Sequence, residues 1–206
     1  IIYSRTDHVP LRTVEDSKKI QHQFLSSDEG GGHIKNLYLR DNKKRNILIV
    51  AEQDRGINLK LLSSRLGVGR LSFGSAERLM DNLGVRPGAV TPLAMITGAQ
   101  QGVTIFIDHE LKNCAQIYVH PLVNDRTLGI SPDNLVKFLN KVGVQPEWID
   151  LSETAVPESM SCPVSRATVK SAVFNASISL LKIFSFVASD ISSSFSSSSV
   201  RPFWSL

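Results

Sequence analysis

The strongest pattern in this sequence is a pair of β-strand signals separated by a short polar turn. Residues 34–40 alternate between apolar and polar side chains, which is typical of a strand with one buried face. Residues 46–52 form a second apolar run of strand length. Between them lies the polar sequence Asp-Asn-Lys-Lys-Arg, residues 41–45. The pattern therefore predicts a β-hairpin over residues 34–52.

Helix signals and further strand signals follow along the chain. Three segments each follow an Asn or Ser N-cap and precede a glycine, and they predict helices at residues 59–66, 76–83 and 132–142. Short apolar runs between turn residues predict strands at residues 93–97, 103–108, 116–120, 127–130 and 147–151. Together these elements predict an α/β (α+β) fold, a single domain with a mixed, largely antiparallel β-sheet flanked by short helices.

The composition of the chain changes near residue 152. Beyond that point serine dominates, and only three of the 19 acidic residues of the 206-residue chain remain. Such a sequence buries too little apolar surface to fold alone, so residues 152–206 are expected to be a disordered Ser-rich extension. Residues 172–188 are apolar but are interrupted by Asn175, Lys182 and serines, so we expect no membrane span there. The folded domain is expected to cover residues 1–151.

Charge, cysteine and histidine patterns exclude several classes of site. A net charge of +4 permits a nucleic-acid partner without requiring one. Cys114 and Cys162 are far apart, so no disulfide framework is predicted and a cytoplasmic location is expected. The five histidines include no i, i+4 pair, so no metal site is predicted. The glycines at 30–32 precede a predicted strand and lack the Gly-Lys-Ser/Thr of a phosphate-binding loop, so no nucleotide cofactor is predicted either.

Lys35 stands out within the first predicted strand. Residues two apart on a strand share a face, so Lys35 should lie on the same side as Leu37 and Leu39. A lysine on a core-facing side would stand at the mouth of an apolar pocket with its charge only partly solvated. Alternatively, its stem covers apolar surface at a strand end while the ammonium group reaches water. The pattern alone leaves both interpretations open.

Three other features carry candidate chemistry, each with an ordinary alternative. The Lys-Lys-Arg cluster at 43–45 suits phosphate contact, although such turns are often simply solvated. His120 ends a predicted strand, where a histidine can be catalytic or structural. The segment 88–92, Gly-Ala-Val-Thr-Pro, can aim successive backbone N–H groups at one point, as an oxyanion site requires, but common turns have the same composition.

In combination and in this order, these motifs resemble a known family. The segments "DHVPLRTVED", "GGHIKNLYLRDNKK", "LGVRPGAVTPLAMI" and "YVHPLVNDRTLGISPDNLVKFL" are similar to the YbaK-like aminoacyl-tRNA deacylases, which are related to the editing domain of bacterial prolyl-tRNA synthetase. The resemblance is greatest to the freestanding branch that removes alanine mischarged on proline tRNA. It covers about residues 3–151. Since this family has a helix before the present start, the domain is expected to lack its first helix.

The resemblance implies roles for individual residues. It implies catalytic roles for Lys35, Gly88, Ala89 and His120. The backbone amides around Gly88 and Ala89 would contact the ester carbonyl. It implies substrate-binding roles for Asn36, Val90, Thr91 and Pro92. Contact with phosphates of the tRNA acceptor end is expected for Lys43, Lys44 and Arg45.

The expected activity is therefore hydrolysis of the ester of a mischarged aminoacyl-tRNA in trans, with alanine on proline tRNA as the first choice. An activated ester needs a positioned water and oxyanion stabilisation, so neither a metal nor another cofactor is expected. The pocket would exclude proline by size. Prolyl-tRNA synthetase is a second expected partner. Two alternatives remain: the same chemistry on cysteine, serine or threonine, and a catalytically silent homologue that binds tRNA or a synthetase.

Overall fold

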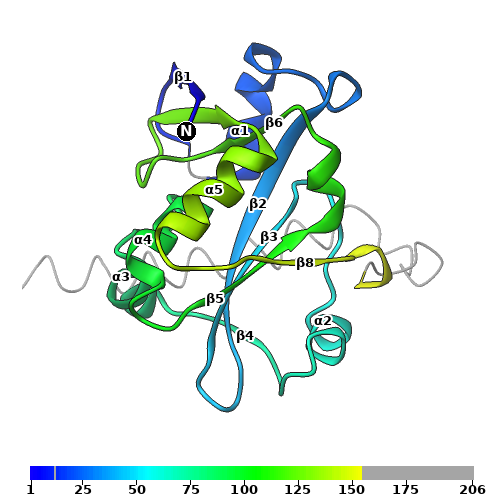
Figure 1. The fold of residues 1–206 in the computed structure, drawn as a ribbon, viewed down its shortest axis with the longest axis vertical. Coiled ribbons are helices and arrows are strands. Elements are labelled where there is room, and N and C mark those ends of the chain that lie inside the picture. Colours follow the sequence, from blue (N-terminus) through cyan, green and yellow to red (C-terminus); the bar gives the residue numbers. More distant parts are fainter. Residues whose placement is uncertain (12, 155–206) are drawn as a thin grey trace, which may run out of the picture. The chain divides into compact units, whose positions relative to one another are not determined.

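The computed structural model describes residues 1–11 and 13–154 of the chain (Figure 1). Most of the predicted Ser-rich extension, including residues 172–188, lies outside the described residues. The strands are β1 (Tyr3–Asp7), β2 (Gly31–Arg40), β3 (Asn46–Glu52), β4 (Ser72–Phe73), β5 (Thr104–Asp108), β6 (Gln116–Val119), β7 (Arg126–Ile130) and β8 (Glu147–Ile149). The α-helices are α1 (Val14–Ile20), α2 (Leu59–Arg65), α3 (Ala76–Leu83), α4 (Met95–Gly98) and α5 (Pro132–Lys141). Single 3₁₀ turns are η1 (Gln21–Gln23), η2 (Ser27–Glu29), η3 (Pro92–Ala94), η4 (His109–Asn113) and η5 (Ser152–Thr154).

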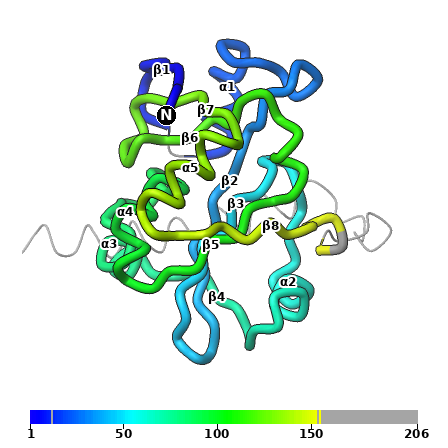
Figure 2. The backbone as a smooth tube through the Cα atoms, in the orientation of Figure 1, coloured from blue at the N-terminus to red at the C-terminus, as the bar shows by residue number. Residues whose placement is uncertain are grey.

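The described strands form one mixed sheet. Its order is β1-β7-β6-β2-β3-β5-β8, and β4 pairs with the outer end of β2. Four neighbouring pairs are antiparallel, namely β1–β7, β6–β7, β2–β3 and β2–β4. Three are parallel, namely β2–β6, β3–β5 and β5–β8. The predicted α/β fold with a mixed sheet and short flanking helices is confirmed. Figure 2 shows the tube of β2 and β3 running side by side through the middle of the domain.

Each face of the sheet carries its own apolar core. One face, which we call the α5 face, packs Leu48, Val50 and Ile117 against α3, α4 and α5. The opposite face, the α2 face, packs Leu39 and Ile49 against α2. Side chains alternate between these faces along each strand, and residues paired across antiparallel strands share a face.

Most of the predicted elements are confirmed. The β2–β3 hairpin forms in the expected place, and the helices begin at the predicted caps. For example, the Asn58 side chain accepts hydrogen bonds from the amides of Lys60 and Leu61.

The prediction of a strand at residues 93–97 is wrong, because this segment forms η3 and α4. Thr91 is an N-cap whose Oγ1 accepts a hydrogen bond from the Leu93 amide, and Pro92 occupies the first helical position. An apolar run of five residues is compatible with either a strand or a buried helical turn, so the capping pair decides its structure.

The glycine run also lies differently from the prediction, because β2 begins at Gly31 rather than after the glycines. A Cβ atom on Gly31 would lie 1.9 Å from the carbonyl oxygen of Leu25, so only glycine fits there. The glycines therefore allow the chain after α1 to cross close to the start of β2.

Candidate active site

The candidate site is a crevice that opens where the parallel strands β2 and β6 separate. Their pairing ends at His33 and Tyr118, and β6 itself ends one residue later. Beyond this point a cavity of about 300 Å³ is lined by β2, by His120 and by residues of the segment 88–92. The carboxyl ends of parallel strands are a common position for ligand sites in α/β sheets. The topology thus brings together three motifs that are far apart in the sequence.

Asn36 fixes the loop of residues 88–92 to the sheet. Its Nδ2 donates a 2.9 Å hydrogen bond to the carbonyl oxygen of Val90. Its Oδ1 is buried and has no hydrogen-bond partner among the described residues. Gly88 and Val90 line the crevice, whereas Ala89, Thr91 and Pro92 are buried and do not line it.

The backbone amides of this loop are not equivalent. The amide of Ala89 donates to the carbonyl oxygen of Arg86 at 3.0 Å, so it is engaged within the turn. Within the described chain, the amides of Gly88 and Val90 have no acceptor. Gly88 has a positive φ of 87°, which glycine adopts at no steric cost. The free amides are therefore those of Gly88 and Val90, and not that of Ala89 as the resemblance implied.

The side chain of Lys35 projects from β2 on the α2 face, together with those of Leu37 and Leu39, as the alternation predicts. Asn36, the next residue, leaves from the α5 face, although both residues line the crevice. The ammonium group of Lys35 donates a short hydrogen bond to the carbonyl oxygen of Arg55. Burial lowers the pKa of Lys35 below its ordinary value, while the nearby carboxylate of Glu52 opposes that change. The lysine is thus a half-buried cation at the edge of the crevice.

His120 lies directly after β6 and faces the same crevice. Its Nδ1 is 3.3 Å from the carbonyl oxygen of Arg126. Because a carbonyl oxygen only accepts, the hydrogen of a neutral ring is placed on Nδ1, and Nε2 keeps its lone pair. Burial lowers the pKa of His120 below its ordinary value, which favours the neutral ring. The ring can therefore accept a proton at Nε2.

Sequence reasoning missed the inner part of the crevice. A smaller cavity of about 40 Å³ continues from it beneath α1 and is lined by His33, Gln53, Tyr118 and Thr127. Tyr118 stacks on His33, with ring centroids 5.1 Å apart, and its ring also packs at a tilt against that of Phe24, with centroids 4.6 Å apart. A sequence signal for Gln53 did exist, because the hairpin register places it opposite His33 and on the Lys35 face.

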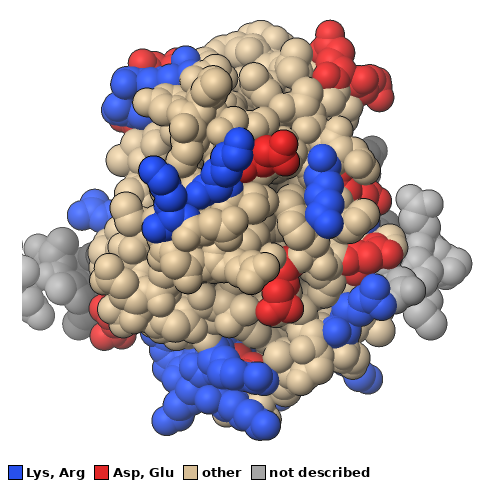
Figure 3. Space-filling view, viewed as in Figure 1, with Lys and Arg blue, Asp and Glu red and all other residues tan. Residues whose placement is uncertain are grey.

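The basic cluster Lys43, Lys44 and Arg45 forms the tip of the β2–β3 hairpin and is separate from the crevice. Arg45 is paired with the buried carboxylate of Asp41 at 2.7 Å, whereas Lys43 and Lys44 make no ion pair within the described residues. Figure 3 shows Lys and Arg side chains gathered at this end of the molecule. At roughly 3.3 Å per strand residue, the tip lies on the order of 20 Å from Asn36.

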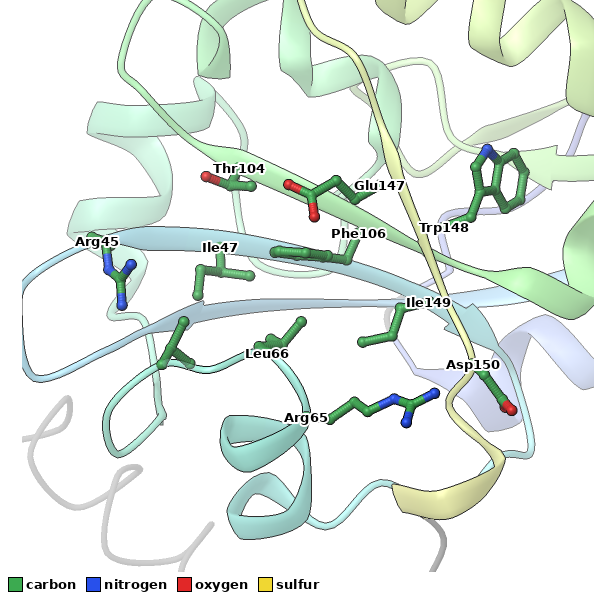
Figure 4. Close-up of a pocket in the computed structure, with 11 residues that line it drawn as sticks. Arg45, Ile47, Arg65, Leu66, Thr104, Phe106, Glu147, Trp148, Ile149 and Asp150 are labelled. Carbon is green, nitrogen blue, oxygen red and sulfur yellow. The ribbon is translucent and has the colours of Figure 1, made fainter.

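A second hollow lies elsewhere on the α2 face, between the hairpin, α2 and β8. It has a volume of about 500 Å³, and Phe106 and Ile149 are among the residues that line it (Figure 4). Of the residues predicted to be functional, it contains only Arg45. The crevice, which collects Lys35, Gly88 and His120, is therefore the better candidate for chemistry.

The part of the chain that the structure describes contains no group of three His, Cys, Asp or Glu side chains able to hold a metal ion. None of its helices has the length and apolar character needed to cross a bilayer.

Comparisons with known proteins show the family to which this chain belongs. The sequence model of the aminoacyl-tRNA editing domain matches residues 8–138, and the chain belongs to this family. It is 33% identical to the prolyl-tRNA editing protein ProX of Acetoanaerobium sticklandii over 152 residues, which cover 73% of this chain and 90% of that protein.

Two further comparisons differ in how much of each chain they cover. The prolyl-tRNA synthetase associated domain-containing protein 1 of Danio rerio is 39% identical over 114 residues, covering 54% of this chain but only 62% of that protein. A solved structure of a candidate trans-editing enzyme for prolyl tRNA synthetase superposes with a TM-score of 0.53 at 18% identity, covering 72% of this chain and 85% of the other. At that identity the superposition shows a shared fold.

Proposed function

We propose that this protein hydrolyses the ester bond of mischarged aminoacyl-tRNA in trans, and that alanine on proline tRNA is its principal substrate. The observation that carries the proposal is that Lys35, Gly88 and His120 line one crevice, and that the Gly88 amide has no acceptor among the described residues. The similarity to an editing protein named for prolyl-tRNA supports the choice of tRNA.

The chemistry needs only these groups and a water molecule. His120 Nε2 takes a proton from water as the water oxygen attacks the ester carbonyl carbon, and the amides of Gly88 and Val90 donate to the oxyanion that forms. The carbon–oxygen bond to the ribose then breaks, and the ribose oxygen takes up the proton. Lys35 contributes positive charge beside the aminoacyl group or the terminal phosphate. Asn36 acts indirectly, since it holds Val90 and thereby the loop.

The substrate is tested directly with proline tRNA charged separately with alanine, cysteine, serine and proline. We expect loss of the alanyl ester far above its spontaneous rate and no loss of the prolyl ester, because the pyrrolidine ring exceeds the small inner cavity. Stability of all four esters in the presence of the folded protein would favour the silent tRNA-binding homologue instead.

The His120 assignment predicts a particular pH dependence. Since burial lowers the pKa of the folded-state ring, Nε2 is free at neutral pH and becomes protonated only as the pH falls through that lowered value. We expect kcat/KM for alanyl-tRNA to stay level down to about pH 6.5, the ordinary histidine pKa, and to fall below it. In His120→Gln the plateau should drop and this acid limb should disappear. An identical acid limb in the variant would assign the titration to another group.

The hairpin tip is proposed to contact phosphates of the acceptor stem. Replacing Lys43 and Lys44 together by serine should weaken binding of proline tRNA and lower the slope of log Kd against log salt concentration by about two, one for each phosphate contact. The matched control changes Lys137 and Lys141, two exposed lysines of α5, to serine. Equal slopes for the two double variants would show that the tip is an ordinary solvated turn.

A further inference from the structure

The inner end of the crevice holds a buried amide that the proposed mechanism does not use. Gln53 follows β3 directly and is only 6% exposed. Its backbone amide donates to the carbonyl oxygen of His33 at 2.9 Å, which continues the β2–β3 register by one residue. Its side chain therefore leaves from the α2 face, together with those of His33 and Lys35.

The side-chain nitrogen of Gln53 lacks a partner. Its Nε2 is buried and makes no hydrogen bond to any described residue. Buried polar groups in native proteins are nearly always paired, and a group left unpaired in a cavity marks a place where a ligand atom can complete the bond. Gln53 lines both the outer crevice and the small inner cavity, so the side chain that bears the unpaired nitrogen forms part of the wall of the space that a substrate would enter.

Three other polar side chains around the inner cavity already make hydrogen bonds, whereas Nε2 of His120, which also lines it, is assigned to the proton transfer. His33 Nε2 lies 2.9 Å from the carbonyl oxygen of Leu25, and the Tyr118 hydroxyl accepts a hydrogen bond from the Leu25 amide. The Thr127 hydroxyl lies 2.8 Å from His8 Nε2. By contrast, Gln53 Nε2 is left free to meet a substrate atom.

The size of the inner cavity limits which substrate side chain can supply the atom that bonds to Gln53 Nε2. One water-sized sphere occupies roughly 10–15 Å³, so a cavity of about 40 Å³ accommodates only a few heavy atoms. A methyl or hydroxymethyl side chain fits this volume. When the ester carries alanine, a water molecule can accept the hydrogen bond from Gln53 Nε2. When it carries serine, the side-chain hydroxyl would accept that hydrogen bond directly.

We propose that Gln53 is a specificity-determining residue that donates a hydrogen bond to the side-chain hydroxyl of a seryl ester, so that the protein hydrolyses seryl-tRNA(Pro) as well as alanyl-tRNA(Pro). This inference rests on the proposed function. Of the alternative amino acids cysteine, serine and threonine, the pocket would accept serine. A site with an unpaired buried donor discriminates against a ligand of equal size that fills the space without offering an acceptor.

The test compares seryl esters with α-aminobutyryl esters on proline tRNA, because the second side chain replaces the hydroxyl by a methyl group. Alanyl and prolyl esters are measured in parallel. For the natural protein we expect kcat/KM to be about tenfold higher for seryl than for α-aminobutyryl ester. Gln53→Met, which keeps the length of the side chain and removes the amide, should bring this ratio close to one. The control Gln101→Met alters an exposed glutamine and should keep the natural ratio.

Three results would overturn the inference while alanyl hydrolysis persists: no seryl hydrolysis, equal rates for the seryl and α-aminobutyryl esters, or an unchanged ratio in Gln53→Met. Absence of alanyl hydrolysis in the natural protein would instead overturn the proposed function, and this inference with it. The comparison of the two substrates on the natural protein requires no variant, so it holds even where a substitution impairs folding.

Discussion

Lys35→Met should reduce kcat/KM for alanyl-tRNA by at least about a hundredfold while the protein remains folded. The substitution keeps an unbranched apolar stem over the α2 face but removes the cation at the edge of the crevice. Loss of one group that stabilises developing charge typically costs a factor of about 10²–10³ in rate. Single-turnover deacylation, together with a thermal unfolding curve, measures both quantities.

Two further substitutions separate a catalytic role from a structural one. Lys35→Arg keeps the charge and should recover part of the lost rate, whereas Lys60→Met, on the exposed side of α2, should leave the rate unchanged. A large fall in the melting temperature of Lys35→Met, with activity per folded molecule preserved, would assign Lys35 to packing. That outcome would restore the interpretation of a lysine whose stem merely covers apolar surface.

Arg55→Leu is expected to lower the free energy of unfolding by about 3–5 kcal/mol. The Arg55 side chain is 11% exposed, and its Nε lies 2.7 Å from Oδ2 of Asp108, a carboxylate that is 1% exposed. Asp108 also accepts hydrogen bonds from the amides of Glu52 and Glu110. Removing Arg55 leaves the buried carboxylate without its cation, and an uncompensated buried charge is strongly destabilising. Urea unfolding provides the measurement.

The origin of this loss can be checked with a second substitution. Asp108→Asn removes the buried charge but keeps an oxygen acceptor, so the double variant Arg55→Leu, Asp108→Asn should be more stable than Arg55→Leu alone. Arg5→Leu removes an exposed ion pair to Asp7 and should cost less than about 1 kcal/mol. A double variant that is no more stable than Arg55→Leu would indicate that lost packing, and not an unpaired charge, causes the effect.

Capping residues and apolar periodicity predicted much of this fold, because local interactions decide where these helices and strands form. Asn58, Ser75 and Ser131 satisfy the first amides of their helices, and each helix starts where the cap requires. The segment 93–97 failed because its apolar residues carry no period long enough to distinguish a strand from a turn of helix. β1 was not predicted either, since its exposed edge position leaves little apolar pattern to detect.

The candidate site was only partly predictable for a different reason. The period of two along β2 correctly placed Lys35 with Leu37, because strand geometry alone fixes which side chains share a face. The engagement of the Ala89 amide depends on the conformation of a turn, and the unpaired state of Gln53 depends on neighbours from β6, β7 and α1. Contacts between distant segments do not appear in any local window of sequence.

The pairing of β1 with β7 constrains the order in which the domain can assemble. The hydroxyl of Ser4 contacts the carbonyl oxygen of Gly129, 125 residues further along the chain. During synthesis, β1 therefore has no β7 partner until almost the whole domain has been made. β6, which carries His120 at its end, lies between β7 and β2, so the walls of the crevice also close late. Long-range pairing of this kind slows folding, and the nascent chain must remain soluble with its first strand unpaired until the last strands arrive.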